Sequence, residues 1–95
     1  MVEPFEGNAY SLGHNNGNAL CQSDADSYGG MRRTVEAIHE RAMTEIGVLR
    51  KYSHISFSPA QQSQYIAGFT KGYTERRDYI DNYKLHNHYP EIWDT

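Results

Sequence analysis

Apolar residues recur at helical spacing between residues 31 and 49. On a helical wheel, one narrow stripe holds Met31, Val35, Ile38, Ala42, Ile46 and Leu49. Arg50 and Lys51 follow this stripe, and cations are favoured in the last turn of a helix. Because Ser23 and Ser27 can each cap a helix N-terminus, the pattern predicts a first helix over about residues 24–51.

A second helix is predicted over about residues 59–84. Its start combines a capping box, Ser58 to Gln61, with proline at the first helical position, Pro59. Pro90 excludes further helix in the tail, residues 86–95. This helix has a wide face, which holds Tyr65, Gly68, Phe69, Gly72, Tyr73, Tyr79, Ile80 and Tyr83.

Two helices with one short connection predict an all-α fold, an antiparallel helical hairpin. Residues 1–22 show neither helical nor strand periodicity and contain several glycines and asparagines, so they are expected to form an irregular N-terminal arm. The chain of 95 residues has room for one small domain, residues 1–95.

The wide face of the second helix is larger than the narrow stripe of the first helix can cover. Either the N-terminal arm and the tail with Trp93 fold over it, or a second copy of the hairpin does. We favour the second copy, a homodimeric four-helix bundle. Gly68 and Gly72, four residues apart, indicate close approach of another backbone, although they also leave room for neighbouring tyrosines. The predicted partner interface is Tyr65, Gly68, Gly72, Tyr79 and Tyr83.

Composition restricts the class of protein. Cys21 is the single cysteine, so it forms no internal disulfide, and no Cys/His cluster resembles a structural zinc site. No stretch reaches the roughly 18 apolar residues of a membrane span, and the N-terminus has no signal-peptide pattern. We therefore expect a cytoplasmic protein with no membrane partner. The net charge of −3 disfavours nucleic acid as a general partner.

An anion site is predicted at the open end of the hairpin. The hairpin register brings two pairs of arginines together there, beside two glycines whose N–H groups can face a ligand. These residues are Gly29, Gly30, Arg32, Arg33, Arg76 and Arg77. Two alternatives stay open: nearby aspartates can neutralise the arginines within the chain, and the glycines can break the helix. No phosphate-binding motif accompanies the cluster.

Catalytic motifs are not recognisable in this sequence. Neither Cys21 nor any serine has a partnered histidine and acid, and His39 borders the apolar stripe of the first helix. His86 and His88 could bind a metal only with a further ligand such as Glu91, and a surface tail is the simpler interpretation. We expect a protein without enzymatic activity, cofactor or metal.

The stretch QYIAGFTKGYTERRDY resembles helices of small accessory proteins that phages and other mobile elements encode. The resemblance implies that the chain binds and blocks a host factor, a protein or protein–nucleic acid complex such as a component of bacterial defence, in the host cytoplasm. It carries over no functional residue. Two hypotheses therefore follow from the sequence: a helical interaction protein, and a binding protein for a nucleotide-like anion.

Overall fold

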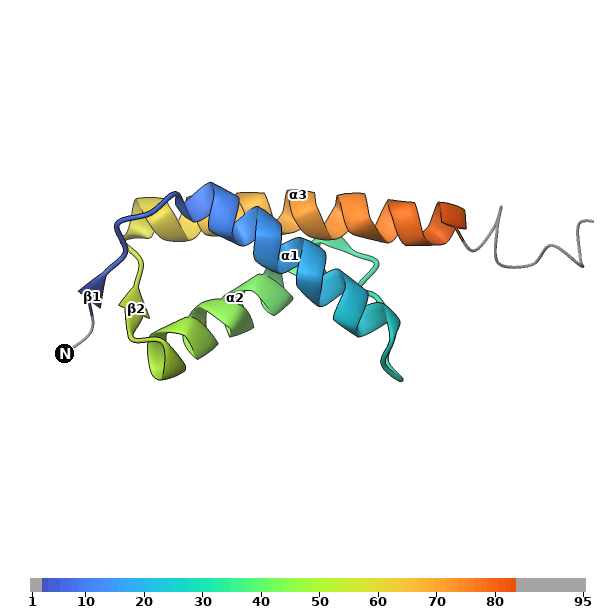
Figure 1. Cartoon of the computed structure of the whole chain (residues 1–95), viewed down its shortest axis with the longest axis horizontal. Coiled ribbons are helices and arrows are strands. Elements are labelled where there is room, and N and C mark those ends of the chain that lie inside the picture. Colours follow the sequence, from blue (N-terminus) through green and yellow to red (C-terminus); the bar gives the residue numbers. More distant parts are fainter. Residues whose placement is uncertain (1–2, 84–95) are drawn as a thin grey trace, which may run out of the picture.

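The computed structural model describes residues 3–83, and helices account for most of them. The elements in this range are β1 (Glu3–Pro4), α1 (Ala9–Ala25), α2 (Val35–Tyr52), β2 (Ile55–Ser56) and α3 (Pro59–Tyr83) (Figure 1). The two short strands pair in parallel, with Glu3 opposite Ile55. The all-α class predicted from the sequence is therefore confirmed. Among the described helices, none has both the length and the hydropathy that crossing a membrane requires.

The start of α3 agrees with its sequence signal. The Ser58 hydroxyl accepts a hydrogen bond from the Gln61 backbone N–H at 3.2 Å, and the Gln61 side chain accepts one from the Ser58 N–H at 2.9 Å. This reciprocal pair is a capping box. Local residues therefore fix the first turn of the longest helix.

The N-terminal segment forms helix α1, so the prediction of an irregular arm over residues 1–22 is wrong. The Asn8 side chain caps the helix by accepting from the Ser11 N–H at 2.9 Å. Glycine and asparagine have low helix propensity, and for this reason the local pattern gave no signal. Contacts with α3 stabilise α1 instead, as is usual for helices in proteins.

Helices α1 and α3 cross with their backbones in contact (Figure 1). Each helix contributes two glycines, four residues apart, namely Gly13 and Gly17 in α1 and Gly68 and Gly72 in α3. A Cβ atom on Gly68 would overlap the carbonyl oxygen of Tyr10, and one on Gly72 would overlap that of His14. The glycines are therefore required by the approach of another backbone, which belongs to the same chain.

The first predicted helix, residues 24–51, is also corrected. It is interrupted by a loop over residues 26–34, and α2 begins only at Val35, after the N-cap Thr34, whose side chain accepts from the Ala37 N–H at 3.1 Å. Gly30 has φ +73°, a left-handed conformation that glycine adopts readily. The helix-breaking alternative for the glycine pair is thus the one observed.

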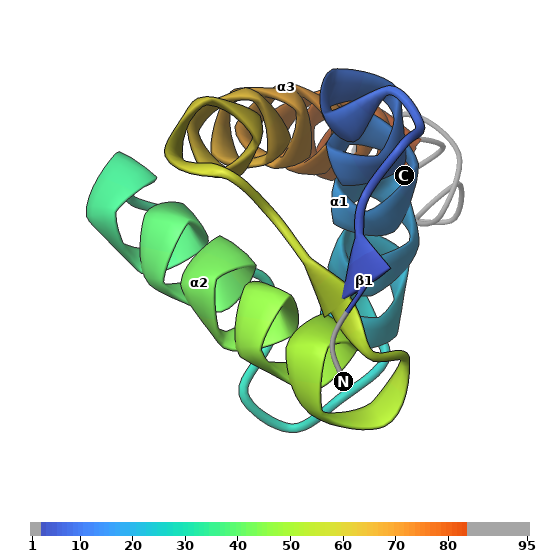
Figure 2. The ribbon, with the colours of Figure 1, turned by 90° about the vertical axis from the view of Figure 1, so that its left-hand side faces the viewer.

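The main partner of α3 is α1 and not α2. Helix α2 is inclined to α3 instead of lying along it (Figures 1 and 2). Helix α1 covers the part of the wide aromatic face of α3 that contains Tyr65, Phe69 and Tyr73, so the alternative in which the N-terminal segment folds over this face is the one observed there. That face no longer argues for a four-helix dimer.

A row of five aromatic rings forms the centre of the core. The ring centroids of successive members lie 5.2, 5.2, 6.0 and 6.0 Å apart, within the range of favourable aromatic pairs. The row runs through Phe5, Phe57, Tyr65, Phe69 and Tyr73. It connects the paired strands to α3, while α2 adds the buried Ile38 and Ala42.

Gly68→Ala is expected to lower the free energy of unfolding by about 1–3 kcal/mol or more, because the added methyl group overlaps the α1 backbone. Gly47→Ala in α2 is the matched control. No atom lies within 4 Å of a Cβ at Gly47, so this change should raise stability by up to about 1 kcal/mol. Urea unfolding followed by circular dichroism measures both. Effects of the same sign would contradict the close crossing.

Candidate functional site

The arginines of the predicted anion site bind groups within the chain. Arg33 donates to both carboxylate oxygens of Asp81, at 2.6 and 3.2 Å. Arg77 donates to the backbone carbonyls of Arg32 and Arg33, at 3.2 and 3.1 Å. Arg77 thus lies next to Arg32 and Arg33, but these two residues belong to the loop before α2 and not to a helix that runs along α3. The contacts themselves are those that the self-neutralised alternative requires.

The glycine pair does not form an anion cradle at a helix N-terminus. Gly30 lies in the loop, where its N–H donates to the Ser27 carbonyl at 3.2 Å and its own carbonyl accepts from Arg32 at 3.3 Å. The positive end of α2 begins after Thr34, and the Thr34 side chain already binds its first turn. The glycine pair and the positive end of a helix, which the sequence predicted to form one anion site, are therefore separated in the fold.

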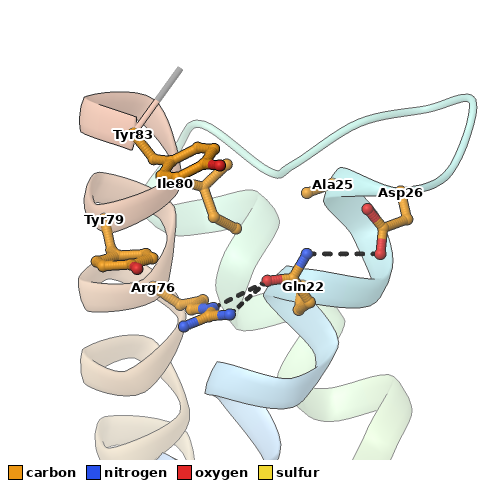
Figure 3. A pocket seen from close by; sticks show the side chains of 7 residues that line it. All are labelled: Gln22, Ala25, Asp26, Arg76, Tyr79, Ile80 and Tyr83. Atoms are coloured by element: carbon orange, nitrogen blue, oxygen red, sulfur yellow. Dashed lines mark hydrogen bonds between the residues drawn. The ribbon is translucent and has the colours of Figure 1, made fainter. Parts of the chain in front are cut away.

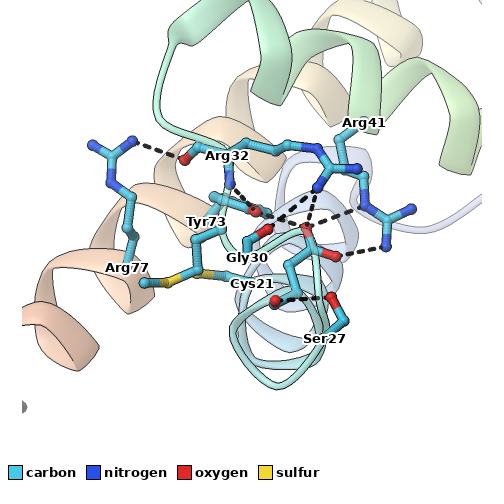
Figure 4. Close-up of polar contacts among 9 residues, drawn as sticks. Cys21, Ser27, Gly30, Arg32, Arg41, Tyr73 and Arg77 are labelled. Atoms are coloured by element: carbon cyan, nitrogen blue, oxygen red, sulfur yellow. Dashed lines mark hydrogen bonds and ion pairs between the residues drawn. The ribbon is translucent and has the colours of Figure 1, made fainter.

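A buried carboxylate organises this end of the molecule, and it is one of the aspartates that the sequence offered as partners of the arginines. Figure 4 shows Arg32, Arg41 and Tyr73 grouped at this site. Asp24, near the end of α1, is only 5% exposed. It accepts two hydrogen bonds from Arg41 of α2, at 3.1 and 3.3 Å, and one from the Tyr73 hydroxyl of α3, at 2.6 Å. Arg32 lies 3.8 Å away. The carboxylate thus joins all three helices, which indicates a structural role.

The buried Tyr73 hydroxyl needs the Asp24 carboxylate as its hydrogen-bond acceptor. A buried hydroxyl must find a partner, and this one donates to Asp24 and accepts from the Arg32 backbone N–H at 2.7 Å. Burial and the neighbouring Asp24 raise the pKa of Tyr73 to about 12. The hydroxyl therefore keeps the proton that it donates.

Cys21 is not a candidate nucleophile in this fold. Its side chain is fully buried, with its thiol 3.5 Å from the sulfur of Met31. Burial, followed by the charge of Asp24, raises the pKa of the thiol to about 11. Because the thiolate is the reactive form, this thiol is inert at neutral pH.

The predicted partner interface is divided by the fold. Tyr65, Gly68 and Gly72 lie in the core, and the Tyr65 hydroxyl accepts from the Asn16 side chain of α1 at 2.8 Å. Tyr79 and Tyr83 lie on the last turns of α3 and are 59% and 49% exposed. The first three residues contact α1 of the same chain and not a partner, which agrees with the alternative that the N-terminal segment folds over this face.

A pocket of about 390 Å³ opens between the C-terminal ends of α1 and α3 (Figure 3). Its lining consists of Gln22, Ala25, Asp26, Arg76, Tyr79, Ile80 and Tyr83. Arg76 donates to the Gln22 side-chain oxygen from two of its nitrogens, at 2.6 and 3.0 Å, and its guanidinium carbon lies 5.0 Å from the centroid of the Tyr79 ring. These contacts fix the guanidinium before any ligand arrives.

The lining combines apolar surface with balanced charge. Ala25 and the buried Ile80 are apolar, and the positive charge of Arg76 is matched by the negative charge of Asp26. The Gln22 amide lies between the two charges, since its nitrogen also donates to Asp26 at 3.4 Å. The pocket is therefore suited to an uncharged, aromatic or aliphatic group that carries a polar tip.

Metal chemistry finds no support in residues 3–83, where no three histidine, cysteine, aspartate or glutamate side chains are grouped to hold an ion. His86, His88 and the tail that contains Trp93 lie outside the described residues. No protein-family model matches the chain, and comparison with curated proteins and with solved structures finds no match either.

Asp24→Asn is expected to lower the free energy of unfolding by about 1.5–3 kcal/mol, because it removes the charged acceptor that the half-buried Arg41 side chain shares with the Tyr73 hydroxyl. Asp78→Asn is the control. Asp78 is exposed and its carboxylate forms a long ion pair of 3.7 Å with Arg77, so this change should cost less than about 1 kcal/mol. Urea unfolding compares the two variants. Equal losses would show that Asp24 does not join the helices.

Proposed function

We propose that this chain is a non-enzymatic interaction protein that binds a protein partner through the pocket between α1 and α3 and the tyrosines beside it. The observation that carries the proposal is the exposure of Tyr79 and Tyr83 on a pocket that also contains Arg76. Tyrosine and arginine are the residue types enriched at binding hot spots.

The pocket is organised in a way that favours binding. Its walls are the ends of two helices whose backbones are in contact. Gln22 and the Tyr79 ring hold Arg76 in place, so little side-chain freedom is lost when a partner arrives. A site with a low ordering cost keeps more of its interaction energy as affinity.

The resemblance of residues 64–79 to helices of phage accessory proteins supports a host macromolecule, such as a component of bacterial defence, as the partner. Inhibition of that partner in the host cytoplasm would be the consequence. Within this stretch, Tyr65, Phe69 and Tyr73 are buried, while Arg76 and Tyr79 line the pocket and can face the partner there.

Tyr79→Ala is expected to reduce capture of the partner at least about tenfold, as truncation of a hot-spot residue does. Tagged chain is recovered from cells of the natural source, and co-purified proteins are quantified by mass spectrometry. Tyr52→Ala is the matched control, because Tyr52 is 69% exposed but lies at the end of α2, away from the pocket. If every co-purified protein is recovered equally with both variants, the proposed surface is wrong.

The second candidate is binding of an anionic small molecule such as a nucleotide. One observation favours it: Arg76 lines a pocket whose volume falls in the range of small-molecule sites. The charge of Asp26 in the same lining opposes an anion, and the other three arginines of the predicted cluster have partners in the chain. The interaction function therefore has the stronger support.

Titration with adenosine monophosphate, followed by calorimetry, tests the second candidate. The interaction function predicts no saturable heat. Saturable binding that is lost in Arg76→Gln and kept in Arg33→Gln would support the anionic ligand instead, because Arg33 is paired with Asp81 and does not line the pocket.

A further inference from the structure

Tyr28 is a fully exposed aromatic residue in the loop between α1 and α2. The loop around it is held by hydrogen bonds. The Gly30 N–H donates to the Ser27 carbonyl at 3.2 Å, and the Ser27 hydroxyl donates to the Asp24 carbonyl at 2.9 Å. Gly30 completes the turn with φ +73°. A turn fixed on both sides therefore presents this ring to solvent.

The ring and the pocket lie at the same end of the molecule. Asp26 lines the pocket, and Tyr28 follows it by two residues. The turn keeps Tyr28 out of the pocket of its own chain, since the residue has no protection from solvent. A solvent-exposed aromatic ring therefore lies two residues, in sequence, from a pocket with aromatic and apolar walls.

We propose that the pocket binds Tyr28 of a second copy of this chain, in a two-fold symmetric dimer in which each copy inserts its Tyr28 into the other. The inference rests on the proposed function, because it names a partner for the same pocket. It also gives the homodimer predicted from the sequence a different interface, at the ends of α1 and α3 instead of along α3.

Symmetry favours this exchange. In a two-fold dimer, if residue i of one copy contacts residue j of the other, residue j of the first copy also contacts residue i of the second. Because Tyr28 and the pocket are at one end, a single end-to-end contact forms both insertions at once. The glycines at positions 29 and 30 add no side chains beside Tyr28, so the tip of the loop is narrow.

The chemistry of the pocket matches a phenol. The ring of Tyr28 can pack on Ala25, Ile80 and Tyr83, and its hydroxyl can donate to the Asp26 carboxylate. An uncharged ring with a polar tip suits a lining in which Arg76 and Asp26 balance each other. Two inserted rings form a small interface, so the dimer belongs to the weak, reversible class.

Sedimentation velocity of the full chain over a wide concentration range tests the proposal. We expect a reversible monomer–dimer equilibrium whose dissociation constant rises at least about tenfold in Tyr28→Ala. Ala25→Phe, which fills the pocket, should have the same effect, while Tyr52→Ala should have none. Tyr28 is fully exposed, so Tyr28→Ala keeps the fold, which circular dichroism verifies.

Mixing the two defective variants distinguishes insertion of Tyr28 into the pocket from a purely structural effect of either substitution. The Tyr28→Ala chain keeps its pocket, and the Ala25→Phe chain keeps its Tyr28. Native mass spectrometry should therefore detect more heterodimer in the mixture than either variant forms as homodimer. A mixture without excess heterodimer would count against insertion of Tyr28 into the pocket.

Two outcomes overturn the inference: a wild-type chain that stays monomeric at every concentration, or a dimer that Tyr28→Ala leaves unchanged. Either can occur while capture of another protein still depends on Tyr79, and the proposed function then stands with a different partner. If Tyr79→Ala leaves capture unchanged as well, the proposed function fails together with the inference.

Discussion

The contact between the backbones of α1 and α3 is the constraint on which the rest of the structure depends. Four glycines make it, two from each helix, and each lies where a Cβ atom would overlap the opposite backbone. The contact stabilises α1, whose own sequence has little helix propensity. It also covers the aromatic face of α3 and brings the C-terminal ends of both helices together, which creates the walls of the pocket.

The second constraint is the charge that this packing buries. Asp24 lies among three helices and is stabilised by Arg41, Tyr73 and Arg32, so removing its charge would take away the acceptor that the three share. The same end of the molecule uses Arg33 and Arg77 for internal contacts. Most of the arginines that crowd this end therefore hold the loop and helices together, and Arg76 is the member of the predicted cluster that lines the pocket.

The division between inward and outward tyrosines separates structure from function in α3. Tyr65 and Tyr73 are buried, and their hydroxyls bind Asn16 and Asp24. Tyr79 and Tyr83, about two and three turns further on, are exposed because α1 has ended and its last residues only border them. The function we propose uses the exposed tyrosine surface on the last turns of α3, where a second chain can add to the packing that α1 begins.

Local chemistry in the sequence determined the class of fold and the start of α3, because a capping box and a proline act within one helical turn. Of the predicted apolar stripe, Ile38 and Ala42 are buried, whereas Val35 is 55% exposed and Met31 lies in the loop before α2. The sequence could not reveal α1, whose helix is stabilised by a distant segment, and it offered the break at the glycine pair only as one alternative. It could not tell which tyrosines face water or which charge pairs with which, as Asp24 and Arg41 show. Only the tertiary structure decided these, because each depends on residues far apart in the chain lying in contact.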